Sequence, residues 1–472
     1  MTPLPHPARL VEAGPSVGPS VGAGVTATAR ERPYELLTLD TVGRYALERG
    51  HLAGATPGEL AVREVGDGNL NAVFVVRAGD RGVAVKQALP YVRVHGPSWP
   101  MTPRRADAEA RAYRLMTRLT PDLVPAFHGY DPDRYALVLE DLSDHRVLRA
   151  ALADGGRPPG VGGRIGLFSG LLTFGTSTFS LPPADHAALV ARFANPDLCA
   201  LTEAMIFDEP YVAHEHNRFA AGAADQVRSL RADRAFRAAV GRLKDAFTGR
   251  SDALVHGDLH TGSVMVGGPG AGPDLAVGAS AGVRGATVGA GAAVEAGRVL
   301  AFDPEFCFVG PFGFDLGLFI ANLLLAALRS EVVDGSAAFR DYIGDQIVDA
   351  WAAFAGEIRR RWPERRDRTD PDSADRTDPD PDSADQTDPD GQTATAGPDR
   401  WLATVWSEVA GFAGLEALRR LIGYAHLPEI DALPADDQLA ITTRVLTAGR
   451  TLVLARDSFT GPAALLTVAG LR

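Results

Sequence analysis

Cysteine is almost absent from this chain, since 472 residues contain only Cys199 and Cys307. Two distant cysteines without metal-ligand spacing argue against a disulfide framework and against a cysteine-ligated zinc site. Long apolar runs are also lacking: the longest, residues 316–328, contains Asn322 and falls short of the roughly 20 residues that span a bilayer. We therefore expect no membrane segment, a buried helix at 316–328, and a reducing cytoplasm as the compartment.

Excess positive charge is missing as well. The chain has 47 Lys and Arg against 59 Asp and Glu, a net charge of −12. This balance does not favour a broad nucleic-acid surface, so any phosphate site must be local. The first thirty residues also lack the basic start and apolar block of a secretory signal.

Three segments have too few large apolar residues to form a packed core. They are an extension at 1–32, a Gly/Ala-rich insert at 267–297 and an acidic near-repeat at 366–397. The rest predicts an α+β protein of two lobes: a small antiparallel β-rich lobe at 33–142 and a larger helical lobe at 143–472. Strands are expected near 64–76, 82–87, 135–140, 254 and 300, and helices near 187–193, 235–247, 338–361 and 402–421.

A glycine-rich turn at 66–74 (GDGNLNAVF) is followed by a short strand that ends in Lys86. Taken alone, the turn is as consistent with an ordinary β-hairpin as with a phosphate-binding turn, and a single lysine on a strand is usually a solvated charge. Together they are typical of a nucleotide site, in which backbone N–H groups approach phosphates and the lysine contacts the α/β-phosphates. Glu109, on a following helix, is the expected partner of Lys86.

The clearest signal is the segment 254–263 (LVHGDLHTGS), which has the pattern of a catalytic loop. Asp258 is the expected acceptor of a proton from a substrate hydroxyl, and His256 a packed scaffold residue. A second motif at 302–306 (FDPEF) supplies Asp303 and Glu305, hard oxygen ligands that suit Mg²⁺ beside ATP phosphates. Asp315 is expected to cap the next helix or to tie it to the catalytic loop.

This ordered set resembles the methylthioribose kinase family, in the aminoglycoside-phosphotransferase-like branch of the protein-kinase-like fold. The resemblance covers roughly 34–430 and rests on 66–74, KQALP and GPSWP at 86–100, DLHTGS, DPEF and 411–423 (GFAGLEALRRLIG). It implies ATP-dependent phosphorylation of the C1 hydroxyl of 5-methylthioribose in methionine salvage, and a homodimer. The residues implied in nucleotide and metal binding are Asn71, Lys86, Glu140, Asp141, Leu142, Asp303, Pro304 and Glu305.

The resemblance also implies that Arg419 and Arg420 bind the acceptor together with Asp258, although a tandem arginine pair is more often a solvated helix face. Trp99 lies in an irregular loop that could close over the acceptor, or it could simply be packed. Two alternatives stay open: another kinase of this fold, acting on an aminoglycoside, choline or homoserine, and a non-catalytic nucleotide-binding scaffold.

Overall fold

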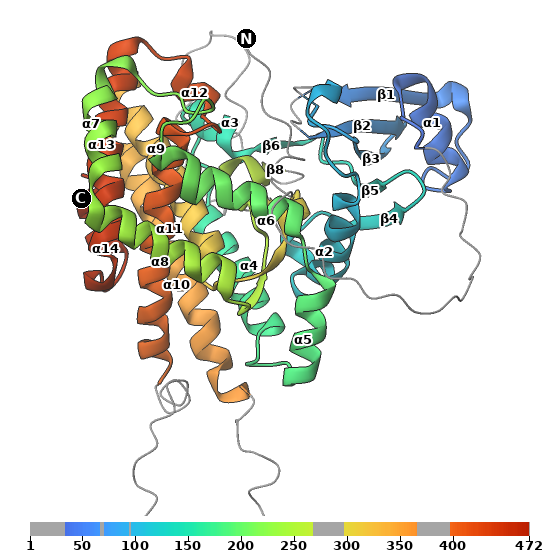
Figure 1. Ribbon diagram of the computed structural model, residues 1–472. Helices are drawn as coiled ribbons and strands as arrows, with labels where there is room; N and C mark the ends of the chain where they lie inside the picture. The colour runs from blue at the N-terminus through green and yellow to red at the C-terminus, as the bar shows by residue number, and fades with distance from the viewer. Residues whose placement is uncertain (1–33, 67–69, 94–95, 268–296, 366–396, 472) are drawn as a thin grey trace, which may run out of the picture. The chain divides into compact units, whose positions relative to one another are not determined.

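The computed structural model describes residues 34–66, 70–93, 96–267, 297–365 and 397–471 (Figure 1). The expected extension and nearly all of both inserts lie outside these residues, as do positions 67–69 of the glycine-rich turn. The chain divides into two compact units. We call them the strand-rich unit, which runs to residue 117 and includes 125–143, and the helical unit, which comprises 118–124 and 144–472.

The strand-rich unit is built on a five-stranded antiparallel sheet of order β1-β2-β3-β5-β4. Every second residue of β2 from Ala72 to Ala78 packs with Val85 of β3 and with α1 into one core that includes Val42 and Phe74. A two-residue turn with Gly79 at φ +59° joins β2 to β3 and fixes their register. The elements are α1 (Leu39–Glu48), β1 (Leu60–Val65), β2 (Asn71–Ala78), β3 (Arg81–Ala88), α2 (Arg105–Leu119), β4 (Phe127–Asp131) and β5 (Ala136–Glu140).

Long helices make up most of the helical unit: α4 (Val161–Thr176), α9 (Phe314–Val333), α10 (Ala337–Arg361), α11 (Pro398–Ile422) and α13 (Ala435–Leu454). α10 packs along α4, while α11 packs against α9 and α13. Glycines permit the closest approach, because a Cβ at Gly162 would lie 1.9 Å from the carbonyl oxygen of Gln346. α9 is long and apolar enough to cross a membrane, but most of it is buried inside the fold.

Two small antiparallel sheets lie among these helices. β7 (Ala253–Val255) pairs with β10 (Phe308–Gly310), and β8 (Val264–Gly267) pairs with both β6 (His145–Val147) and β9 (Arg298–Ala301). The loop from β7 to β8 and the loop from β9 to β10 carry the two sequence motifs. Because β10 returns to pair with β7, both loops emerge at the same place in the unit.

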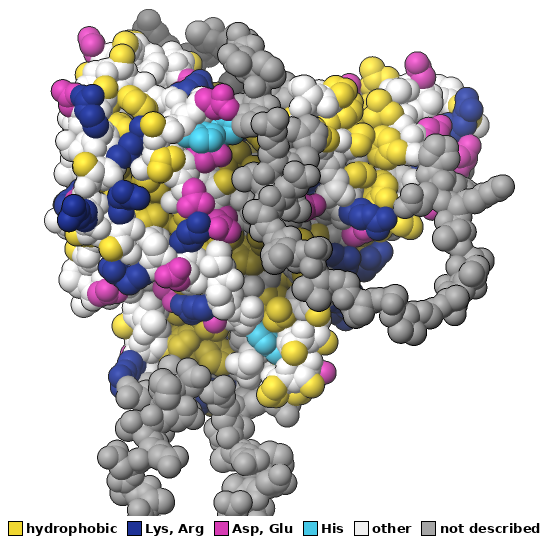
Figure 2. Space-filling view, in the orientation of Figure 1, with side chains coloured by type: hydrophobic (Ala, Val, Ile, Leu, Met, Phe, Trp, Pro, Cys, Tyr) yellow, Lys and Arg dark blue, Asp and Glu magenta, His cyan; other side chains and the backbone are white. Residues whose placement is uncertain are grey.

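Further helices complete the helical unit (Figure 1). They are α3 (Leu148–Ala153), α5 (Pro183–Arg192), α6 (Pro196–Glu203), α7 (Ala224–Ala232), α8 (Arg234–Gly249), α12 (Pro428–Asp431) and α14 (Pro462–Val468). A π-helical turn (Ala204–Asp208) and a 3₁₀ turn (Glu209–Tyr211) follow α6 directly. On the face drawn in Figure 2, basic and acidic side chains are interspersed over this unit.

The α+β class is confirmed, and the predicted strands and helices overlap observed ones. α5 and α11 each begin four residues before the predicted start, at Pro183 and Pro398. Proline is favoured in the first turn of a helix, where its missing N–H has no intrahelical partner to lose. The apolar run at 316–328 forms the buried core of α9, as expected.

Candidate active site

Lys86 lies on the central strand β3, and its Nζ contacts Glu109 Oε1 on α2 at 2.7 Å. The expected pairing is therefore confirmed. Both side chains are buried, so removing either one would leave a charge without its partner in a poorly solvated place. The pair holds the lysine ammonium in a fixed position.

Asn71 begins β2 and is held by a residue that the sequence analysis missed, Arg105. This guanidinium is 2% exposed. It donates to Asn71 Oδ1 at 3.0 Å and to the carbonyl oxygens of Leu70 and Leu89 at 2.7 and 2.8 Å. No sequence signal separates Arg105 from the neighbouring Arg104, because its partners come from distant parts of the chain.

The predicted nucleotide-binding residues 140–142 lie at and just after the end of β5. The Glu140 N–H donates to the Ala126 carbonyl at 2.9 Å, and its carboxylate accepts from the Ala126 N–H at 3.0 Å. Asp141 accepts from the Ser143 N–H at 2.9 Å. Leu142, which follows, is half-buried.

Trp99 is half-buried in a loop that folds back on itself. Its N–H donates to the Gly96 carbonyl at 3.1 Å, and its carbonyl accepts from the Val92 N–H at 2.9 Å. Both backbone groups of Trp99 are thus bonded to residues earlier in the same loop.

In the helical unit, the loop after β7 carries His256, Gly257 and Asp258. The Asp315 carboxylate, in the first turn of α9, accepts from the backbone N–H groups of His256 and Gly257 at 2.6 and 3.0 Å. Burial raises the pKa of Asp315 and lowers the pKa of His256. The expected tie between α9 and the catalytic loop is confirmed, and His256 is fully buried, as a scaffold residue should be.

Asp258 faces three cationic or potentially cationic side chains. Its Oδ1 lies 3.7 Å from Arg419 Nη2, and its Oδ2 lies 3.4 Å from His260 Nε2. Burial alone would raise the pKa of Asp258, but His260, Arg419 and Arg420 outweigh it and hold that pKa well below its usual range. Asp258 is therefore ionised at neutral pH.

The second motif follows β9 directly. Asp303 adopts φ +67°, a left-handed conformation that is uncommon for a residue with a side chain. An oxygen of its carboxylate lies within 4.8 Å of one from Glu305, and Asn195 Nδ2 donates to the Glu305 carbonyl at 2.9 Å. His256 Nε2 contacts the Phe302 carbonyl at 2.9 Å, which links this loop to the catalytic loop.

Arg419 and Arg420 are each 6% exposed, so the solvated-face interpretation is wrong. Glu416, fully buried on the same face of α11, accepts from Nε of both arginines, with Arg420 at 2.7 Å. It also accepts from Asn322 Nδ2 on α9 at 3.0 Å. Sequence reasoning missed Glu416, although a Glu three and four residues before an arginine pair is a readable helical signal.

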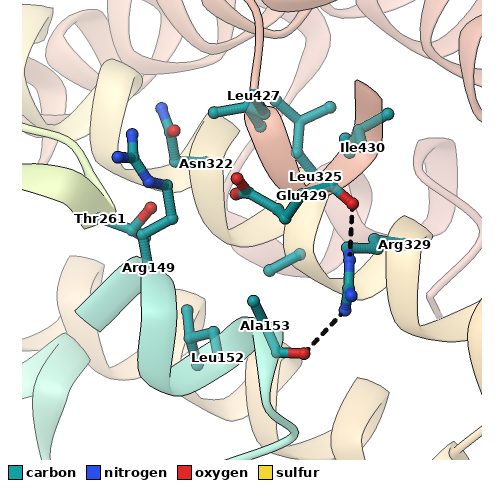
Figure 3. Close-up of a pocket in the computed structure, with 11 residues that line it drawn as sticks. Arg149, Leu152, Ala153, Thr261, Asn322, Leu325, Arg329, Leu427, Glu429 and Ile430 are labelled. Atoms are coloured by element: carbon teal, nitrogen blue, oxygen red, sulfur yellow. Dashed lines mark hydrogen bonds between the residues drawn. The ribbon is translucent and has the colours of Figure 1, made fainter. Parts of the chain in front are cut away.

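A small pocket, partly open to solvent, adjoins this network (Figure 3). Thr261 of the catalytic loop and Asn322 line it, together with Arg149 and Arg329. Arg329 is held by the carbonyl oxygens of Ala153 and Glu429, the bonds dashed in Figure 3. The predicted residues thus form two groups: Asn71, Lys86, Trp99 and 140–142 in the strand-rich unit, and Asp258, 303–305, Arg419 and Arg420 in the helical unit.

Replacing Glu416 with Gln is expected to lower the free energy of unfolding by about 3–5 kcal/mol at pH 7, because two buried guanidiniums lose the negative charge of the carboxylate that both of them contact. Burial alone would raise the pKa of Glu416, but Arg419 and Arg420 lower it from the ordinary 4.5 to about 2. A depressed folded-state pKa gives stability that is complete above 4.5 and is lost as the pH falls towards 2.

Urea unfolding of the original chain and of Glu416→Gln, at pH 7 and in the middle of that acidic window, measures the free energy of unfolding. The difference in this free energy between the two proteins should be smaller in acid than at pH 7. The control is Glu331→Gln, which breaks a half-exposed pair with Arg444 and should cost at most about 1 kcal/mol. If Glu416→Gln lost as little free energy of unfolding at pH 7 as Glu331→Gln, Glu416 would not stabilise the buried arginine pair.

The sequence is similar to those of known methylthioribose kinases over most of its length. It is 35% identical over 440 residues to a methylthioribose kinase of Pectobacterium atrosepticum, covering 92% of this chain and 97% of that protein. It is 34% identical over 439 residues to a methylthioribose kinase of Geobacillus kaustophilus, covering 92% and 96%. No family model matches the sequence.

Among solved structures, a choline/ethanolamine kinase family protein of Mesorhizobium loti is 14% identical with a TM-score of 0.37, covering 90% of this chain and 99% of that one. A putative aminoglycoside phosphotransferase of Ralstonia eutropha is 12% identical with a TM-score of 0.37, covering 89% and 98%. Scores this low carry no argument. The antiparallel sheet of the strand-rich unit and the larger helical unit are the α+β architecture expected from the sequence.

Proposed function

The chain belongs to the methylthioribose kinase family, and from this membership we propose that it transfers the γ-phosphoryl group of ATP to the C1 hydroxyl of 5-methylthioribose. The product is 5-methylthioribose 1-phosphate, an intermediate of methionine salvage. One observation in the structure supports this reaction above the others: an ionised carboxylate, Asp258, lies beside the buried Arg419 and Arg420. Such a site can orient an alcohol and neutralise a phosphoryl group.

Nucleotide binding is assigned mainly to the strand-rich unit. Lys86, fixed by Glu109, contacts the α/β-phosphates, and Asn71 at the start of β2 contributes a polar side chain. The backbone at 140–142 offers hydrogen bonds to adenine. Because the Glu140 N–H is already bonded to Ala126, the donors at this edge are those of Asp141 and Leu142.

Asp303 and Glu305 fit a magnesium ion, because they present carboxylate oxygens within 4.8 Å of each other on one short turn. Pro304 between them fixes the backbone of that turn. Bound there, Mg²⁺ neutralises charge on the phosphate oxygens. The left-handed conformation of Asp303 is the strain expected where a functional side chain must point in one direction.

In the reaction, the C1 oxygen attacks the γ-phosphorus, the bond from that phosphorus to the β,γ-bridging oxygen breaks, and ADP leaves. The hydroxyl proton passes to Asp258. Since its low pKa makes Asp258 a weak base, the carboxylate first orients the hydroxyl and accepts the proton late, as the new P–O bond forms. Arg419 and Arg420 stabilise the developing charge, and Trp99 covers the acceptor.

Cationic acceptors such as choline or aminoglycosides would favour an acidic pocket, whereas Asp258 is next to two buried guanidiniums. The catalytically dead scaffold is also disfavoured, because Lys86, Asp258, Asp303 and Glu305 are all present. We further propose a homodimer in the cytoplasm, in keeping with the family.

The experiment that tests the function gives the purified protein ATP and Mg²⁺ with one acceptor at a time. Phosphorus NMR should detect a sugar 1-phosphate from 5-methylthioribose, at a kcat/KM at least a hundred times that for choline, homoserine or an aminoglycoside. A higher kcat/KM for any of the amines would refute the acceptor, and no turnover on all four would refute the activity.

A further inference from the structure

Two histidines and a glutamate meet in the helical unit, outside the residues assigned to the reaction. Glu209 begins the 3₁₀ turn after α6, and His214 and His216 follow in the next loop. Glu209 Oε2 lies 2.9 Å from His216 Nδ1 and 3.6 Å from His214 Nδ1. One ligand atom from each residue lies within 4.8 Å of the other two.

These distances suit a single metal ion. In a tetrahedral zinc site with bonds of about 2.0–2.1 Å, neighbouring ligand atoms are about 3.3 Å apart. The same carboxylate oxygen already faces both imidazoles at separations close to that value. His214 Nδ1 accepts from the His216 backbone N–H at 3.3 Å, a long hydrogen bond that a metal ion at Nδ1 would replace.

We propose that Glu209, His214 and His216 form a site for one Zn²⁺ ion, with water in the fourth position. The donor set decides the class of metal: two imidazole nitrogens and one carboxylate suit zinc, whereas the oxygen-only pair at 303 and 305 suits magnesium. The two proposed metal sites therefore differ in the type of their ligand atoms as well as in their position in the chain. The zinc site does not depend on the proposed reaction.

The surrounding loop is already shaped by hydrogen bonds. Asn217 Nδ2 donates to the carbonyl oxygens of Glu209 and Val212 at 2.6 and 2.9 Å, which closes the loop on itself. The Arg218 N–H donates to the Gly423 carbonyl at 3.2 Å, at the end of the helix that carries Arg419 and Arg420. Zinc would therefore join the turn after α6 to the loop that contacts the end of α11.

The test uses the full chain, freed of metal with a chelator that is then removed. Calorimetric titration should show one Zn²⁺ per chain, and Co²⁺ in its place should give the strong visible absorption of a tetrahedral site. His214→Ala/His216→Ala should weaken zinc binding at least a hundredfold and abolish the cobalt spectrum. His128→Ala, an exposed histidine on β4, is the control and should bind zinc as the original chain does.

A milder variant, Glu209→Gln, keeps the size of the side chain and removes one ligand charge. It should fold, as circular dichroism can verify, and bind zinc at least tenfold more weakly. Zinc should also raise the Tm of the original chain and of His128→Ala, but not that of the double variant. Unchanged zinc affinity in both the double variant and Glu209→Gln, or no zinc binding by the original chain, overturns the proposal.

Discussion

Replacing Asp258 with Asn is expected to lower kcat for 5-methylthioribose phosphorylation by roughly 10²- to 10⁴-fold, the usual contribution of a positioned base. The amide keeps nearly the same shape, but it cannot accept the hydroxyl proton and it removes the negative charge beside Arg419. The KM for ATP should change little, because the nucleotide contacts assigned to Lys86 and Asn71 remain. Steady-state assays of ADP release, with each substrate varied in turn, separate these effects.

Asp245→Asn is the matched control, since Asp245 is an exposed residue on α8 with the same chemistry. It should retain full activity. Circular dichroism and Tm should match the original chain for both variants, so that a loss of kcat cannot be assigned to unfolding. If Asp258→Asn retained more than a tenth of the original kcat, the role of Asp258 as proton acceptor would be wrong.

The sequence was most informative where a short motif brings its own local structure. The alternation before Lys86 predicts β3, and the loop at 256–258 followed by the acidic turn at 303–305 predicts two neighbouring strand connections. Asp315, in the first turn of α9, was expected to reach the catalytic loop, and it does. These features depend on residues close in sequence or on a familiar order of motifs.

Partners from distant segments could not be predicted. Arg105 holds the start of β2 through the Leu70 carbonyl and Asn71, and it also donates to the Leu89 carbonyl after β3, yet carbonyl partners leave no trace in a sequence. Asn195 contacts the metal motif from more than a hundred residues away in the same manner. Arg419 and Arg420 were left between a solvated and a buried interpretation, because only the packing of α11 against α9 decides which face is covered.

The insert at 267–297 separates the catalytic loop from the metal motif in sequence, yet the strand register brings the two ends of the insert together. Gly267 pairs with Arg298 at the end of the β8–β9 ladder, so the residues that flank the insert are neighbours. Lengthening a connection whose ends already meet costs little free energy, since closure entropy grows only with the logarithm of loop length. The motifs on either side therefore keep their positions.

Replacing Gly257 with Ala is expected to lower kcat at least 100-fold and the free energy of unfolding by about 2–5 kcal/mol. Gly257 has φ +84°, where a side chain is strained, and a Cβ there would lie 2.1 Å from the Phe306 carbonyl oxygen. Backbone must move to relieve that contact. The movement would separate the loop that holds Asp258 from the turn that holds Asp303 and Glu305. Urea unfolding and steady-state kinetics measure the two losses.

Gly155→Ala separates the two causes, because Gly155 has a similar φ of +78° but a Cβ added there would meet no atom within 4 Å. It should show the conformational cost alone, about 1–2 kcal/mol, with kcat unchanged. The excess loss in Gly257→Ala then reports the contact with Phe306. If the two variants lost equal stability and kept equal activity, the prediction would be wrong. The contact between residue 257 and Phe306 would then not hold the catalytic loop and the metal turn together.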